Sequence, residues 1–141
     1  MPENQAPSQA STFGVSDKSA GHRDAGEDKG GGAVLIYSTF PTLDTARVLA
    51  RQLIKARLAA CVNVIPGMVA IYEFEGRLHE DGEAVCIIKT RRSLRDACVS
   101  AVCDGHPYSN PAAVSLDISG GAPAYLAWLM ESTRSPQSGS E

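Results

Sequence analysis

The stretch HPYSNP at residues 106–111 holds the side chain with the widest chemical range in this sequence. His106 is one of three histidines in the chain. Imidazole changes charge near neutral pH and is the commonest metal ligand in proteins, so His106 could act as a metal ligand or as an acid/base catalyst. The ring could instead be a structural part of a turn that the flanking prolines form. The residue alone leaves all three interpretations open.

A metal site at His106 needs further ligands. A soft or borderline cation held by protein alone normally has three or four nitrogen, sulfur or carboxylate ligands. Close in sequence the chain offers Asp104 and the hydroxyls of Tyr108 and Ser109, which is a thin supply. Symmetry-related copies could add ligands on a shared axis. His106 is therefore a candidate metal ligand that lacks a full set of partners nearby.

Two other charged segments could bind small ions. KTRR at 89–92 ends a predicted strand, and Lys89 could receive an anion or a carboxylate there, although a solvated basic edge would have the same composition. Carboxylates surround a predicted hairpin, which indicates either weak affinity for divalent ions or a solubilising tip. These carboxylates are Glu73, Glu75, Glu80, Asp81 and Glu83.

The motifs of common enzyme classes are missing from the sequence. It contains no nucleophile elbow, HExxH, P-loop or GxGxxG pattern. Cys103 has no histidine placed by sequence to activate it as a nucleophile. We therefore predict a protein that is not an enzyme.

Composition excludes several classes of partner. The 141 residues carry a formal charge of -3 and 43% apolar side chains, as in a globular domain that does not bind nucleic acid. No apolar run reaches the roughly 18 residues that span a bilayer, so no membrane association is expected. Four cysteines without C-x-x-C spacing indicate buried, reduced thiols and a cytoplasmic location.

The domain is predicted to occupy residues 33–134. Residues 1–32 are polar and end in three glycines, and residues 135–141 are similarly poor in apolar side chains. Such segments bury too little surface to offset their ordering entropy, so both are predicted to be disordered tails.

Apolar periodicity and turn residues predict seven elements. AVLIYSTF is a continuous apolar, β-branched run suited to a buried strand, and Thr42 can cap the helix that follows. Ser93 can cap a second helix, which Gly105 ends; its spacing turns Cys98 toward the core and Cys103 away. The predicted elements are a strand at 33–40, a helix at 43–57, a strand at 59–74 bent at 66–67, a strand at 77–90, a helix from 93 to 105, a strand at 112–118 and a helix at 125–131.

This order predicts an α+β fold, a ferredoxin-like β-α-β-β-α-β sandwich with a short C-terminal helix. Two helices would pack on one face of an antiparallel sheet. The second and third strands are too apolar to leave the other face wet, so self-association is expected.

Five segments in this order resemble the CutA divalent-cation-tolerance family across roughly residues 33–134. The segments are LAACVNVIPG, IYEFEGR, IKTRRSL, HPYSNP and YLAWL. The resemblance implies a PII-like homotrimer, whose hairpins form sheets between subunits, and an association with tolerance to copper and other divalent ions. No catalytic reaction comes with it.

The chain departs from the family where copper ligands have been proposed. Relatives with such ligands have a cysteine at the end of the first strand and a pair of histidines before Pro-Tyr; this chain has Ser38 and the pair Gly105-His106. Ser109 and Ala112 stand where the family usually has glutamates. Only His106 remains as a candidate ligand of that set.

The resemblance supports three functional hypotheses. The first is a non-catalytic homotrimer in divalent-ion tolerance, with weak or degraded binding of a divalent metal ion such as copper. The second is a PII-like sensor that binds a small anion or a partner protein at clefts between subunits, by fold analogy. Lys89, Tyr108 and Trp128 are the candidate cleft residues. The third is a plain assembly scaffold.

Overall fold

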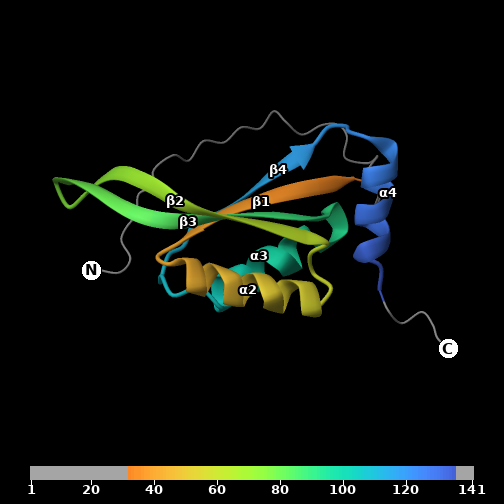
Figure 1. Cartoon of the computed structure of the whole chain (residues 1–141), viewed down its shortest axis with the longest axis horizontal. Coiled ribbons are helices and arrows are strands. Elements are labelled where there is room, and N and C mark those ends of the chain that lie inside the picture. The colour runs from red at the N-terminus through yellow and green to blue at the C-terminus, as the bar shows by residue number, and fades with distance from the viewer. Residues whose placement is uncertain (1–31, 136–141) are drawn as a thin grey trace.

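The computed structural model describes residues 32–135. They form one antiparallel sheet of strand order β2-β3-β1-β4, with helices packed against it (Figure 1). This confirms the predicted ferredoxin-like order with its additional C-terminal helix. The elements are β1 (Ala33–Phe40), α2 (Leu43–Lys55), β2 (Cys61–Phe74), β3 (Arg77–Arg91), the 3-10 turn η2 (Arg92–Leu94), α3 (Arg95–Asp104), β4 (Ala113–Ile118) and α4 (Pro123–Ser132). The predicted disorder of the two tails lies outside the described residues, apart from residues 32 and 135.

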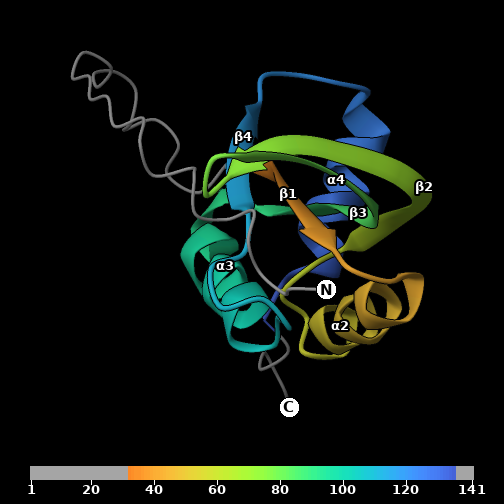
Figure 2. The same ribbon diagram turned by 90° about the vertical axis from the view of Figure 1, so that its left-hand side faces the viewer.

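The core lies between the sheet and the helices α2 and α3, which share one face of it (Figures 1 and 2). Alternate residues of β1 point to this face, as a strand's period of two requires. Val34, Ile36 and Phe40 are each 0% exposed. The helices add Ala46, Leu49, Leu53, Cys98 and Val102. Cys103 is exposed, so the predicted orientations of Cys98 and Cys103 are both confirmed.

Helix α2 begins as predicted and ends two residues earlier. The Thr42 hydroxyl accepts a hydrogen bond from the Thr45 N–H at 3.1 Å, so Thr42 is the N-cap. At the other end Arg57 adopts the left-handed conformation (φ 61), and the Leu58 N–H donates to the Leu53 carbonyl. This is the hydrogen-bond pattern of a helix end with a left-handed residue, which explains why the helix stops.

The hairpin of β2 and β3 contains the predicted bend. Strand pairing shifts between Ile65 and Met68, where Pro66 has no N–H to donate and Gly67 adopts φ 81. The tight turn at Glu75 and Gly76 also has positive φ values, 53 and 77. In Figure 1 the hairpin extends beyond the helices.

The prediction that Ser93 caps the second helix is wrong. Strand β3 continues to Arg91, and the Arg92 N–H still donates to the Gly32 carbonyl beside β1. Ser93 consequently lies inside the 3-10 turn and lacks the extended backbone that an N-cap needs. Helix α3 begins only at Arg95, with no side-chain cap. Gly105 does end the helix, at a negative φ of -97.

The second face of the sheet is apolar and largely uncovered within the described part of the chain. Tyr37, Val114 and Leu116 point to this side from β1 and β4, with Ile65 from β2. They are 37%, 54%, 53% and 46% exposed, respectively. Helix α4 crosses only one end of the sheet (Figure 1). We call this surface the open face. In the described range no helix is both long and apolar enough to cross a membrane.

Candidate functional site

His106 is held in the turn after α3 through both of its ring nitrogens. The ring is 9% exposed and stacks on Phe40, with centroids 4.2 Å apart. The Tyr108 backbone N–H donates to Nδ1 at 3.0 Å, so Nδ1 carries no proton. Nε2 must then carry the proton, which it donates to the Thr39 carbonyl at 2.7 Å. His106 is therefore a neutral imidazole with a defined tautomer.

This geometry disfavours His106 as a metal ligand. Burial lowers the pKa of His106, and the hydrogen bond to the Thr39 carbonyl only partly opposes that shift. Both ring nitrogens are occupied, so a metal ion would have to displace one of the two hydrogen bonds. Among residues 32–135 no three histidine, cysteine or carboxylate side chains are grouped closely enough to hold a metal ion. Metal binding at His106 stays a prediction.

The other positions where the chain departs from the family's proposed copper ligands differ in burial. Ser38 is 0% exposed and lies on the helix-facing side of β1, so a ligand there would face the core rather than solvent. Among residues 32–135 its hydroxyl has no hydrogen-bond partner. Ser109 and Ala112 are exposed on the loop that leads to β4. Ser38 is thus buried, whereas the two loop residues are exposed.

Tyr108 instead bonds to a carboxylate of the hairpin. Its hydroxyl donates to Glu83 Oε2 at 2.5 Å, and the Tyr72 hydroxyl donates to Asp81 Oδ2 at 2.5 Å. Desolvation, followed by the hydrogen bond to Asp81, raises the pKa of Tyr72 to about 12. Desolvation and Glu83 likewise raise the pKa of Tyr108. Both phenols therefore stay protonated and act as donors.

The hairpin carboxylates divide into two kinds that the sequence did not separate. Glu73, Glu75, Glu80 and Asp81 are exposed, as expected of a solubilising tip. Glu83 is only 8% exposed. No periodicity marks Glu83 as buried, because its environment comes from Tyr108, 25 residues later in the chain.

Lys89 and Trp128 lie together at the other end of the sheet, through Tyr125. Lys89 Nζ donates to the Tyr125 hydroxyl at 3.1 Å and lies 5.4 Å from the centroid of that ring. The ammonium thus contacts the hydroxyl edge of Tyr125 more closely than its face. The Tyr125 and Trp128 rings follow at a centroid distance of 5.5 Å. Sequence reasoning missed Tyr125, although its three-residue spacing from Trp128 on a helix would have indicated the contact.

The three predicted cleft residues do not meet within one chain. Tyr108 bonds to Glu83, which lies six residues before Lys89 on β3. At the rise of a β-strand this separation is about 20 Å. A cleft containing Tyr108 together with Lys89 and Trp128 would need more than one subunit.

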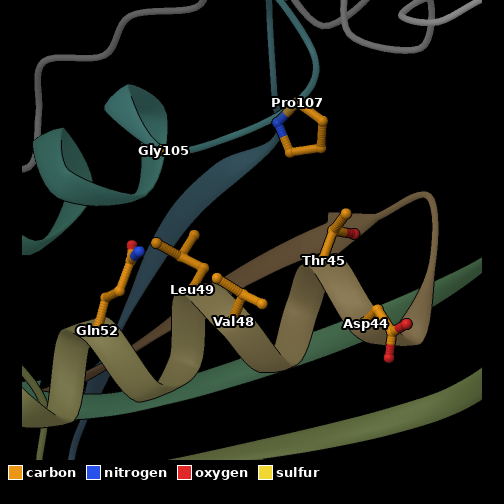
Figure 3. Close-up of a pocket in the computed structure, with 7 residues that line it drawn as sticks. All are labelled: Asp44, Thr45, Val48, Leu49, Gln52, Gly105 and Pro107. Atoms are coloured by element: carbon orange, nitrogen blue, oxygen red, sulfur yellow. The ribbon is translucent and has the colours of Figure 1, made fainter.

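A groove also lies beside the His106 turn, between α2 and the chain at Gly105 and Pro107 (Figure 3). Its volume is about 330 Å³. A Cβ at Gly105 would come within 3.2 Å of Leu49 Cδ1, so the missing side chain allows this close approach. The lining residues are Asp44, Thr45, Val48, Leu49, Gln52, Gly105 and Pro107. They include no predicted site residue and no cation.

Comparison with known proteins identifies relatives of the domain. Residues 34–132 match the family model described as CutA1 divalent ion tolerance protein. "Protein CutA, chloroplastic" from Arabidopsis thaliana is 40% identical over 102 residues, 72% of this chain and 56% of that protein. The chain thus spans little more than half of that relative's length. The crystal structure of CutA1 from Oryza sativa is 41% identical with a TM-score of 0.72, covering 74% of this chain and 96% of that one.

The same comparison contradicts the predicted cytoplasmic location. The Arabidopsis relative is named chloroplastic. A solved structure with 30% identity and a TM-score of 0.70, covering 72% of this chain and 99% of that one, is described as the periplasmic divalent cation tolerance protein CutA from Archaeoglobus fulgidus. The prediction was wrong in its reasoning, because reduced thiols without C-x-x-C spacing do not identify one compartment.

Proposed function

The chain belongs to the CutA1 divalent ion tolerance family, and on this premise we propose that it is a non-catalytic homotrimer in the tolerance of divalent metal ions such as copper. The observation that supports self-association is the exposed apolar surface of the open face. Val114 and Leu116 are 54% and 53% exposed there, beside Tyr37. An apolar sheet face of this kind is a surface that a second subunit covers. The number of subunits follows from the family resemblance.

Two valines of equal exposure allow a matched test of the assembly. Val114 lies on the open face and Val48 on α2, and they are 54% and 52% exposed. We expect Val114→Asp to dissociate the trimer in light scattering, because it buries a charge in the interface. Val48→Asp should leave the trimer intact. A monomeric wild-type chain, or a trimer that tolerates Val114→Asp, would refute the assembly.

Direct metal binding is proposed to be weak. The support is that the lone pair of His106 Nδ1 already accepts the Tyr108 N–H, and that Ser38 supplies a buried hydroxyl where other family members have a thiol.

Metal titrations with two histidine variants test this proposal. Metal-free protein is titrated with copper and with zinc as wild type, as His106→Ala and as His79→Ala, which is matched because His79 also stacks on an aromatic ring. We expect weak binding that His106→Ala changes no more than His79→Ala does. A tight site that only His106→Ala abolishes would refute weak binding and restore His106 as a ligand.

The second candidate is a PII-like sensor of small anions. Lys89 favours it, because no carboxylate within residues 32–135 forms an ion pair with this partly buried ammonium. Thermal-shift measurements with a panel of small anions test the sensor. A melting temperature that no anion in the panel raises would count against it.

A further inference from the structure

Lys89, Tyr125 and Trp128, here called the Lys89 cluster, combine an available charge with exposed aromatic rings. An ammonium has three N–H donors. One goes to the Tyr125 hydroxyl, and no other described residue accepts a hydrogen bond from Lys89. Tyr125 and Trp128 are 42% and 46% exposed, so part of each ring is free for contact. Within one chain the cluster thus presents two unused donors beside aromatic surface.

The far end of α4 anchors the helix that carries the aromatic rings of the Lys89 cluster. Arg91, two residues beyond Lys89 on β3, donates to the Met130 carbonyl and to the Thr133 hydroxyl. Leu129 is 0% exposed beneath the helix. Because α4 is anchored in this way, a ligand would meet rings that are already positioned, and binding would cost little ordering entropy.

Lys89 lies on the open face of the sheet, where its neighbours are apolar. Across the strands Lys89 is paired with Leu35 on one side and Cys61 on the other, and Leu35 is paired with Leu116 of β4. Apolar neighbours reduce solvent screening, which strengthens the attraction between the ammonium and a bound anion.

The neighbouring cations limit the charge that the cluster can accept. Arg91 is committed to α4, and Arg92 forms an ion pair with Asp117 at 2.5 Å. Lys89 differs from these two arginines. Among the described residues, the Tyr125 hydroxyl is the one oxygen to which Lys89 donates a hydrogen bond. A single cation suits a singly charged carboxylate and is a poor match for a polyphosphate, which several cations usually hold.

We propose that the Lys89 cluster is a binding site for a small planar carboxylate, whose charge contacts Lys89 while its flat apolar part packs on Tyr125 and Trp128. This inference rests on the second candidate function and names its ligand class. The carboxylate of the ligand accepts hydrogen bonds from the two unused N–H groups of Lys89. The flat apolar part of the ligand replaces water on the exposed surfaces of Tyr125 and Trp128.

Trp128 is the only tryptophan in the chain, so its fluorescence reports on the cluster directly. The full chain is titrated with benzoate while fluorescence is recorded. Two matched compounds separate the parts of the ligand: cyclohexanecarboxylate has the charge without the planar ring, and benzamide has the ring without the charge. We expect saturable quenching of Trp128 fluorescence by benzoate. Cyclohexanecarboxylate and benzamide should each bind about tenfold more weakly, which corresponds to a loss of about 1.4 kcal/mol in binding free energy.

Two lysine variants identify the charge. Lys89→Met should weaken benzoate binding by about tenfold or more, the size of a lost charge-assisted hydrogen bond. Lys55→Met removes an exposed lysine on α2, which packs on the opposite face of the sheet from Lys89, and should change nothing. Absence of saturable quenching, equal binding of benzamide, or unchanged affinity in Lys89→Met would each overturn the proposal.

Light scattering and thermal melts on the same samples distinguish a failure of the carboxylate site from a failure of the proposed trimer. An intact trimer of normal melting temperature that ignores benzoate overturns only the carboxylate site. A wild-type monomer would instead overturn the proposed assembly, whatever its response to benzoate.

Discussion

The hydrogen bond from Tyr108 to Glu83 ties the loop after α3 to the base of the hairpin, and its removal has a predictable cost. Glu83 is 8% exposed, and within the described residues Tyr108 is the one side chain that donates to its carboxylate. Tyr108→Phe removes that donor with little change of shape. The carboxylate is then left largely buried with one partner fewer.

The expected loss of stability follows from the charge and burial of Glu83. A hydrogen bond to a charged group contributes about 1.5–3 kcal/mol. Some water reaches Glu83, so we expect the lower half of that range, about 2 kcal/mol. For a domain of about 100 residues, each kcal/mol corresponds to about 4–8 °C in melting temperature. Tyr108→Phe should therefore lower Tm by about 8–16 °C.

Tyr72→Phe is the matched control, because Tyr72 donates to Asp81 at the same distance of 2.5 Å while Asp81 is exposed. Water can replace that hydroxyl, so the loss should stay below about 1 kcal/mol. Urea unfolding at one fixed protein concentration measures both variants, since stability of an oligomer depends on concentration. Equal losses in the two variants would refute the argument from burial. Adding Glu83→Gln to Tyr108→Phe should recover part of the loss, because a neutral amide is less costly to bury.

Three further changes test other parts of the structure. Ser38→Ala removes a buried hydroxyl that has no hydrogen-bond partner in the described part of the chain, so the free energy of unfolding in urea should be unchanged or higher by about 1 kcal/mol. A loss of more than about 1 kcal/mol would show that this hydroxyl does form a stabilising hydrogen bond. Glu75 adopts φ 53, so Glu75→Asn should raise the melting temperature by relieving strain of about 1 kcal/mol, and a lower Tm would speak against strain at this turn. The pKa of Tyr72 is raised from 10.0 to about 12 in the folded state, so its contribution to stability is present below pH 10 and is lost toward pH 12. The difference in urea midpoint between wild type and Tyr72→Phe should disappear over that range.

Local patterns in the sequence were sufficient for the arrangement of elements. The apolar run of β1, the spacing of Leu49 and Leu53 on α2 and the turn at Glu75 and Gly76 each depend on residues close in the chain. The failure at Ser93 has a different origin. Its backbone is fixed by the hydrogen bond between Arg92 and Gly32, residues 60 positions apart, and no local pattern reports such a contact.

The candidate site was harder to predict for the same physical reason. His106 was found by its chemistry, but its role depends on Thr39, 67 residues earlier, whose carbonyl accepts a hydrogen bond from Nε2. The partnership of Tyr108 with Glu83 and that of Lys89 with Tyr125 likewise join distant segments. Residue type identified which side chains could act. The fold decides which of these side chains already have hydrogen-bond partners.

That distinction indicates where the chain can still bind something. Buried polar groups with a full set of partners stabilise the fold and resist new ligands, because each new bond must replace an existing one. His106 is in that state, because both of its ring nitrogens are hydrogen-bonded. Within a single chain, Lys89 keeps unused donors beside exposed rings, and the open face exposes apolar side chains. Binding free energy is therefore available at these two surfaces.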